Sequence, residues 1–213
     1  MTKAMTIMGP IDGDQLGVVL PHEHVIIDLS FMYQESSVAG MGTQPVGTID
    51  PKILRVNPTV SKDNLVLGDP DLSVRELDAF KAVGGSSVVD LTLPGLGRDP
   101  RILQEISTRS GVKILCGTGW NAESTHPQLV KQGSVDDLAK VICSELTTGI
   151  EGTPIRAGII GEIGITGPIT QNEEKVLRAA RRSQEITGAA IVIDTLPLQD
   201  DKYAFNALEI LGE

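Results

Sequence analysis

Short apolar runs alternate with amphipathic segments along most of this 213-residue chain. The runs are rich in Val, Ile and Leu, as strands buried on both faces are, and the segments between them carry apolar residues at helical spacing. The alternation therefore predicts an α/β protein in which helices pack outside a parallel sheet. The five expected strands cover residues 16–24, 86–92, 112–116, 157–163 and 189–194.

Local start signals place helices between these strands. Two capping boxes, Ser73 to Glu76 and Thr170 to Glu173, offer side chains that accept hydrogen bonds from the free N–H groups of a first helical turn. Asp99-Pro100 combines such a cap with a first-turn proline. We expect helices that start at Ser73, Asp99, Ser134 and Thr170, and a last one that carries Ala204, Leu208 and Leu211.

Polar side chains stand where the first, fourth and fifth expected strands end: His22, His24, Glu162 and Asp194. In a (β/α)8 barrel the carboxyl ends of all strands face one mouth, where active sites lie. A doubly wound open sheet instead usually has a glycine-rich turn after its first strand, and this chain has the two histidines there. We therefore predict a single domain, residues 1–213, that forms an incomplete TIM barrel of about five βα units.

The segment from about Ser30 to Pro70 lacks this regular pattern and is rich in Gly, Pro, Ser and Thr. Loops of this length are uncommon inside domains and are often lids or insertions with a function. A disordered excursion is the alternative, and the composition does not decide between the two.

The formal net charge of −10 argues against nucleic acid and anionic membranes as partners, because the field of the protein would repel phosphates. The start has no basic segment joined to an apolar run, and no stretch approaches the ~20 apolar residues of a membrane span. We expect a cytoplasmic protein that acts on a small molecule. Cys116 and Cys143 form no CxxC motif and are interpreted as two buried thiols in a reducing cytosol. The chain also lacks the GxSxG and P-loop motifs of other enzyme classes.

His22 and His24 are the first candidates for chemistry. Alternate residues of a strand point to the same side, so the two imidazoles share a face and Glu23 points away from them. Such a pair can bind one metal ion, and only three histidines occur in the chain. A hydrogen-bonded histidine pair at a barrel rim is the alternative. The third, His126, precedes Pro127 in a polar loop and is interpreted as a surface residue.

Two carboxylates complete the candidate set. If Ile160 points into the barrel, alternation turns Glu162 inward as well, and a carboxylate in apolar surroundings needs a cation or a metal ion beside it. Glu162 could bridge two divalent ions, although a buried salt bridge would also satisfy it. Asp194 either binds metal or begins the turn at residues 195–197. Asp90 is expected to be structural or to support the ligands.

Six motifs stand in one order along the chain: LPHEHV (20–25), VDLT (89–92), GRDP (97–100), GTGW (117–120), IRAGIIGEIG (155–164) and EEKVLRAA (173–180). Together they resemble the phosphotriesterase-related proteins of the amidohydrolase superfamily, and the likeness runs from about Gly9 to Asp194. The resemblance implies a (β/α)8 barrel and usually a binuclear centre of the zinc type. It also implies a metal-dependent hydrolase, in which a metal-activated water attacks an ester, lactone, amide or phosphotriester.

The resemblance assigns roles to single residues. His22 and His24 would hold the more buried metal ion, and Glu162 would take the bridging position, where many relatives have a carboxylated lysine. Asp194 stands where the family has a histidine for the second ion, so the second site differs from the family's. The implied cofactor is one or two divalent ions, with zinc first. The implied substrate contacts are Trp120 and Asn121, the latter where a tyrosine is common in lactonases.

The family also supplies a histidine from strand six and, from strand eight, an aspartate that is both metal ligand and proton acceptor. This sequence ends before either, so no catalytic residue beyond the metal ligands is expected within it. Two hypotheses stay open. The chain is an enzyme whose site is completed from elsewhere, or it is a truncated or non-catalytic partial barrel. In the second case it works only by pairing with another chain or as a homodimer, because open sheet edges favour association.

Overall fold

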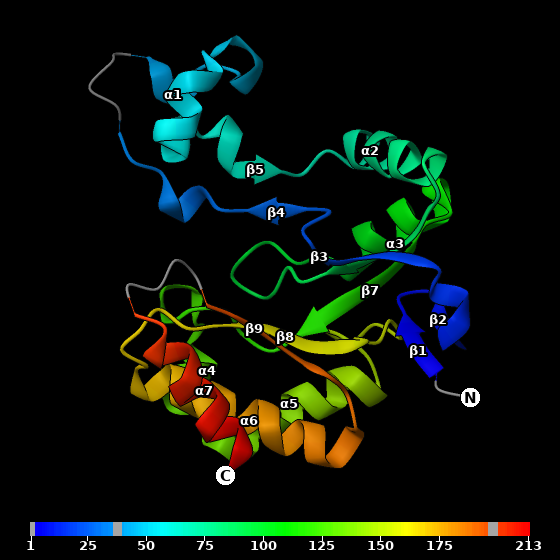
Figure 1. Ribbon diagram of the computed structural model, residues 1–213, viewed down its shortest axis with the longest axis vertical. Coiled ribbons are helices and arrows are strands. Elements are labelled where there is room, and N and C mark those ends of the chain that lie inside the picture. Colours follow the sequence, from blue (N-terminus) through cyan, green and yellow to red (C-terminus); the bar gives the residue numbers. More distant parts are fainter. Residues whose placement is uncertain (1–2, 36–39, 196–199) are drawn as a thin grey trace.

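Five parallel strands form one curled sheet in the computed structural model, which describes residues 3–35, 40–195 and 200–213 (Figure 1). Their order in the sheet follows the order of the chain. Within the described ranges the first and last of these strands each pair with a single neighbour, so the sheet is an open part of a barrel. The strands are β3 (Val18–Glu23), β6 (Gly85–Asp90), β7 (Lys113–Thr118), β8 (Ile159–Gly164) and β9 (Ile191–Asp194).

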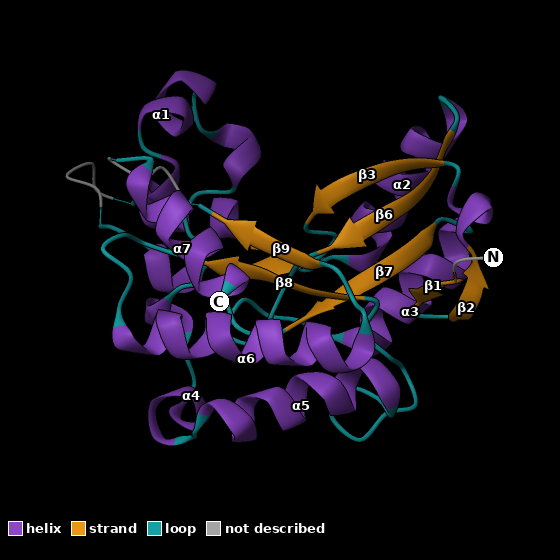
Figure 2. Ribbon diagram, turned by 60° about the horizontal axis from the view of Figure 1, so that its bottom comes forward, coloured by secondary structure: helices purple, strands orange, loops and turns teal. Residues whose placement is uncertain are grey.

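Helices cover one face of this sheet, and α5 and α6 pack side by side against it (Figure 2). The main apolar core lies between sheet and helices and includes the fully buried Leu103, Ile142, Ile160 and Leu177. Burial of each such side chain stabilises the fold by about 1.5–3 kcal/mol. The opposite face carries a smaller cluster around Val89, Leu91 and Leu115. The helices are α2 (Pro70–Ala82), α3 (Pro100–Ser110), α4 (Gln128–Gln132), α5 (Val135–Thr147), α6 (Gln171–Thr187) and α7 (Lys202–Gly212).

Three of the expected helix starts are confirmed, with side chains that accept hydrogen bonds from the first helical turn at Asp99, Ser134 and Thr170. The expected start at Ser73 is wrong. Helix α2 begins at Pro70, where Asp69 supplies the same cap-and-proline signal as Asp99 does for α3. The Ser73 hydroxyl instead donates to the Val25 carbonyl at 2.8 Å, and so ties α2 to the chain just after β3.

The segment between β3 and α2 has structure of its own, so a disordered excursion is wrong for its described part; residues 36–39 lie outside it. At its base β4 (Ile27–Asp28) pairs antiparallel with β5 (Val66–Leu67), and α1 (Pro51–Val56) lies above them in Figure 1. A role as a lid stays a prediction. A separate small core is formed by Met41, Ile49 and Val60. Short 3₁₀ turns cover Ser30–Met32, Met41–Thr43, Val46–Thr48, Pro58–Val60 and Asp63–Leu65.

An N-terminal hairpin lies against the end of the sheet at which the strands begin (Figure 2). It consists of β1 (Lys3–Thr6) and β2 (Gly9–Asp12), and the N–H of Ile7 between them donates to Ile114 O of β7 at 2.9 Å. A Cβ atom at Gly158 would lie 2.2 Å from the Met5 carbonyl oxygen, so glycine is needed for this close approach. The hairpin therefore covers the sheet at the end opposite the histidines.

Candidate metal centre

Three of the four residues expected to bind metal come together at the carboxyl ends of the strands. His22 Nε2 lies 2.5 Å from Glu162 Oε2, and His24 Nε2 lies 3.6 Å from Glu162 Oε1. One ligand atom from each residue lies within 4.8 Å of the other two. The two imidazole rings meet edge to face with centroids 5.8 Å apart. The expected convergence of the two histidines with Glu162 is therefore present, while their role as ligands stays a prediction.

The curl of the sheet makes this meeting possible. His22 lies in β3 and His24 directly follows it, whereas Glu162 belongs to β8. In the sheet, β6 and β7 lie between these two strands. In a flat sheet, strands separated by two others would be about 14 Å apart. Twist and curl bring the carboxyl ends of β3 and β8 to the same side of the sheet, as in a barrel mouth.

The direction of the Glu162 side chain depends on an irregularity in β8. Ile160 pairs with Ile191 and Ile163 pairs with Ile193, so three steps along β8 face two steps along β9. Ile160 and Ile163 are both buried in the core beneath the helices. The expectation that Ile160 points into the barrel is therefore wrong. The extra residue, and not simple alternation from Ile160, turns Glu162 toward the histidines.

Hydrogen bonds fix which nitrogen of His24 carries the proton. The Thr92 hydroxyl donates to the Ile26 carbonyl at 2.8 Å, since a carbonyl oxygen can only accept. Its oxygen must then accept from His24 Nδ1, 3.0 Å away. Burial, followed by the charge of His22, lowers the pKa of His24, although Asp194 opposes this. His24 is thus a neutral imidazole whose Nε2 lone pair is directed toward Glu162.

Glu162 is a carboxylate with little contact to solvent, since its side chain is only 5% exposed. Burial and the nearby charge of Asp194 raise its pKa from the ordinary 4.5 to about 7, against the opposing effect of His22. Buried carboxylates are costly unless donors or cations surround them. Glu162 therefore lies where a cation would stabilise its ionised form.

The Oε2 atom of Glu162 provides the test of whether a metal ion fits. It is buried and accepts no hydrogen bond from any residue in the described ranges, although His22 Nε2 lies 2.5 Å away. This contact is an ion pair when His22 is protonated, and it lowers the pKa of Glu162, but its geometry is not that of an aligned hydrogen bond. An orphaned carboxylate oxygen beside two imidazole nitrogens matches the N and O donor set of zinc sites. The residues therefore fit a divalent ion.

Asp194 stands at the end of β9, where its partner in the pairing with β8 is Gly164. Its charge acts on both Glu162 and His24, which places the half-buried carboxylate near the cluster. It does not belong to the group of three whose ligand atoms lie within 4.8 Å of one another. The alternative expectation, a turn at 195–197, cannot be compared, because residues 196–199 lie outside the described ranges. A role in binding metal stays a prediction.

Trp120 and Asn121 follow β7 directly and have different surroundings. The Trp120 side chain packs into the main core and is 3% exposed. Asn121 Nδ2 donates to Glu162 Oε1 at 3.0 Å. Substrate contact by either residue stays a prediction, while the contact that the structure shows for Asn121 is with the carboxylate of the candidate centre.

His126 is buried, so its interpretation as a surface residue is wrong. Its Nε2 atom donates to the Asn121 carbonyl at 2.7 Å, and burial lowers its pKa, which keeps the ring neutral. A polar loop sequence does not reveal that the loop folds back on itself.

Asp90 supports the loop around His24, as expected. It accepts hydrogen bonds from Val25 N at 2.7 Å and Thr92 N at 3.1 Å, next to His24 and its partner.

Comparisons with known proteins identify the family of this chain. A model of the phosphotriesterase family matches residues 2–213. An N-acetyltaurine hydrolase from Tetraodon nigroviridis is 38% identical over 194 residues, which cover 90% of this chain and 56% of the relative. A phosphotriesterase-related protein from Nematostella vectensis is 35% identical and covers 99% of this chain. The chain spans between 56% and 61% of the length of these two relatives.

A solved structure shows the same fold in detail. A resiniferatoxin-binding protein from Rhodobacter sphaeroides superposes with a TM-score of 0.93 at 37% sequence identity, over 99% of this chain and 59% of that protein. This similarity confirms the expected fold class, an incomplete barrel of the TIM type.

Proposed function

The chain belongs to the phosphotriesterase family of hydrolases, and on that premise we propose that His22, His24 and Glu162 hold a divalent metal ion at a hydrolytic site. The observation that carries this proposal is the approach of both imidazoles to the buried Glu162 carboxylate, whose Oε2 lies 2.5 Å from His22 Nε2 and accepts no aligned hydrogen bond within the described ranges. A bound divalent ion supplies polarisation of a carbonyl or phosphoryl oxygen and a lower pKa for a water molecule. Zinc is the proposed ion, because imidazole and carboxylate donors suit it.

The chain's own residues prepare this site for a cation. The Thr92 hydroxyl oxygen accepts a hydrogen bond from His24 Nδ1–H, and this leaves the Nε2 lone pair of His24 available. Burial and the charge of Asp194 raise the pKa of Glu162 to about 7, and a cation held by this side chain and the two imidazoles would favour its ionised form. Asp194 would contribute to a second ion, because its charge already acts on Glu162.

The proposed reaction is hydrolysis of an ester, lactone, amide or phosphotriester. The Tetraodon relative is named for the hydrolysis of N-acetyltaurine, which contains an amide bond. We therefore place amides first among the substrates to be tested. The ligands that the family takes from its sixth and eighth strands would come from residues beyond this sequence or from another chain.

Calorimetric titration of the metal-free protein with zinc and with manganese tests the proposal. Wild type is expected to take up at least one ion per chain, and a His22→Ala/His24→Ala double variant to take up none. Wild type that binds fewer than about 0.2 ions per chain, although folded, would reject the proposed centre. Hydrolysis of N-acetyltaurine, a lactone and a phosphotriester is then compared between wild type and the double variant, and any turnover by wild type is expected to be lost in the double variant.

A second candidate function rests on the two sheet edges. Within the described part of the chain β3 and β9 each have one neighbour, and Val18 of β3 is 61% exposed. Strand edges of this kind pair readily with other chains. The chain would then work as a partial barrel joined to a second copy or to a complementing chain. Sedimentation separates the cases: a sharp dimer supports pairing, and a monomer that binds metal and turns over substrate rejects the need for it.

Location in the cell stays a prediction. Among the described residues no helix has both the length and the apolar character needed to cross a bilayer. We propose the cytoplasm on the grounds of the sequence alone.

A further inference from the structure

We infer that Asn121 is a positioning residue that sets the orientation of the Glu162 carboxylate, an inference that rests on the proposed metal centre. Asn121 Nδ2 donates to Glu162 Oε1 at 3.0 Å. Both residues are buried, with 6% and 3% of their surface exposed. A hydrogen bond between a buried amide and a buried carboxylate is stronger than the same bond in water.

The amide group of Asn121 can take only one orientation. Its Oδ1 atom accepts from the backbone N–H of Ala122 at 2.7 Å. If the amide were flipped, two donors would face each other at that place, and an oxygen would face the carboxylate. The main chain of the loop therefore directs the NH₂ group toward Glu162.

The loop that carries Asn121 is itself anchored. The Asn121 carbonyl accepts from His126 Nε2 at 2.7 Å, and the Ala122 carbonyl accepts from Thr125 N at 2.9 Å. On the other side, a Cβ atom at Gly164 would lie 2.8 Å from Asn121 Oδ1 and 2.7 Å from Ala122 N. Glycine at position 164, two residues beyond Glu162, thus leaves room for the Asn121 side chain.

These contacts divide the two oxygens of Glu162 between two tasks. Oε1 is occupied by Asn121, with His24 Nε2 next to it, and Oε2 is left facing His22 without a hydrogen bond. Removal of the Asn121 amide would let the carboxylate rotate about its terminal torsion, which is broad. Loss of a partner that orients a metal ligand typically weakens metal binding by about 10- to 100-fold.

Asn172 offers a matched control. Its Nδ2 atom donates to the Glu123 carboxylate at 2.7 Å, so the same type of bond is made to the same loop but to a different acid. In zinc titrations of the folded variants we expect Asn121→Ala to weaken binding by about 10-fold or more and Asn172→Ala by less than about 3-fold. Equal affinities for the two variants would overturn the positioning role.

A second measurement needs neither metal nor the Asn121 variant. In metal-free ¹⁵N-labelled protein, the side-chain amide signals of Asn121 are expected to shift in Glu162→Ala, and those of Asn172 in Glu123→Ala, without cross-effects. Unchanged Asn121 signals in Glu162→Ala would overturn the bond. If wild type binds no zinc although these amide signals shift, the proposed function is rejected and the hydrogen bond between Asn121 and Glu162 is supported. If wild type and Asn121→Ala bind zinc with equal affinity, the proposed function is supported and the positioning role is rejected.

Discussion

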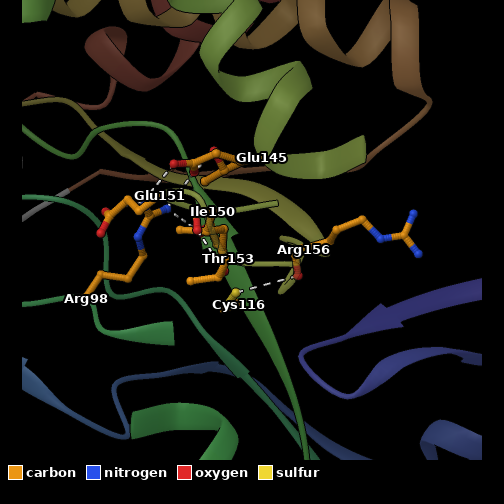
Figure 3. Close-up of polar contacts among 9 residues, drawn as sticks. Arg98, Cys116, Glu145, Ile150, Glu151, Thr153 and Arg156 are labelled. Carbon is orange, nitrogen blue, oxygen red and sulfur yellow. Dashed lines mark hydrogen bonds and ion pairs between the residues drawn. The ribbon is translucent and has the colours of Figure 1, made fainter. Parts of the chain in front are cut away.

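Two buried glutamates lie near the end of β7, and their surroundings differ in one respect. Glu145 of α5 accepts from Arg98 through both oxygens, at 2.7 and 2.8 Å, and from the Thr118 hydroxyl at 2.6 Å. Arg98 also reaches Glu151, as Figure 3 shows. Glu162 of β8 accepts from Asn121 at one oxygen, and its other oxygen has no donor in the described ranges.

The difference separates a structural carboxylate from a candidate ligand. A buried carboxylate that accepts hydrogen bonds at both oxygens from an arginine fork and a hydroxyl is already compensated in charge and does not need a further cation. A buried carboxylate that has one oxygen without a hydrogen bond and lies next to two imidazoles lacks such an arginine, and burial raises its pKa. Burial alone therefore does not distinguish a candidate metal ligand from a structural carboxylate. The number of hydrogen bonds that each buried carboxylate accepts distinguishes Glu162 from Glu145.

The largest expected effect is the loss of stability when the ion pair between Arg98 and Glu145 is removed. Arg98→Met leaves the Glu145 carboxylate buried without its main partner and should cost about 3–5 kcal/mol of unfolding free energy, measured in urea. Arg109→Met is the control, because Arg109 pairs with Asp71 and Glu105 at the surface, and its loss should be far smaller. Similar losses for the two variants would contradict the assignment of Glu145 as structural.

The next effect is on the unsatisfied acid. Glu162→Gln should weaken zinc binding by about 100-fold, whereas Glu23→Gln should change it by less than about 3-fold. Glu23 is the matched control, because it lies between the two histidines in the sequence but does not belong to the group of three whose ligand atoms lie within 4.8 Å of one another. Equal losses in calorimetry would show that both acids face the cation.

A third buried acid lies between these cases. Asp90 accepts one backbone N–H at each oxygen, so Asp90→Asn would place an NH₂ group against a donor and cost about 1–3 kcal/mol. Asp63→Asn serves as control, because Asp63 accepts from Val46 N at the surface. Urea unfolding measures both, and a neutral Asp90→Asn would mean that the loop after β3 does not depend on this acid.

The smallest effect is in the dependence of stability on pH. The folded-state pKa of Glu162 is about 7 and its ordinary value is 4.5, so between these pH values the folded protein binds more protons than the unfolded chain. Its contribution to stability is thus present below pH 4.5 and is lost as pH rises through about 7. Glu162→Gln should flatten this decline in stability, measured in urea with chelator at several pH values. Parallel profiles for variant and wild type would contradict the raised pKa.

The parts of the structure that local chemistry determines were predictable from the sequence. The alternation of apolar runs gave the five parallel strands, and Asp99-Pro100 gave a helix start, because these signals act within a few residues. The meeting of His22 and His24 with Glu162 followed from strand ends in a curled parallel sheet.

The remainder depends on contacts between distant segments. The extra residue of β8 that turns Glu162 is visible only in the register of β8 with β9. Because of this residue, the prediction that Ile160 points into the barrel is wrong. His126 is buried because its loop folds back on Asn121, and no local pattern reports such a fold. The identity of the second partner of Glu162, the Asn121 amide, likewise needed three-dimensional placement.

The curled sheet also has a mechanical consequence. Within the described ranges β3 shares backbone ladder bonds only with β6, so the far ends of the sheet are held by curvature and not by pairing with each other. A cation bound by His22, His24 and Glu162 would act as a cross-link between positions 22 and 162. It would connect the first strand of this sheet to the fourth. The rigidity of this end of the sheet would then depend on whether metal is bound. The loop after β3 would exchange its amide hydrogens faster in the metal-free protein than in the metal-bound protein.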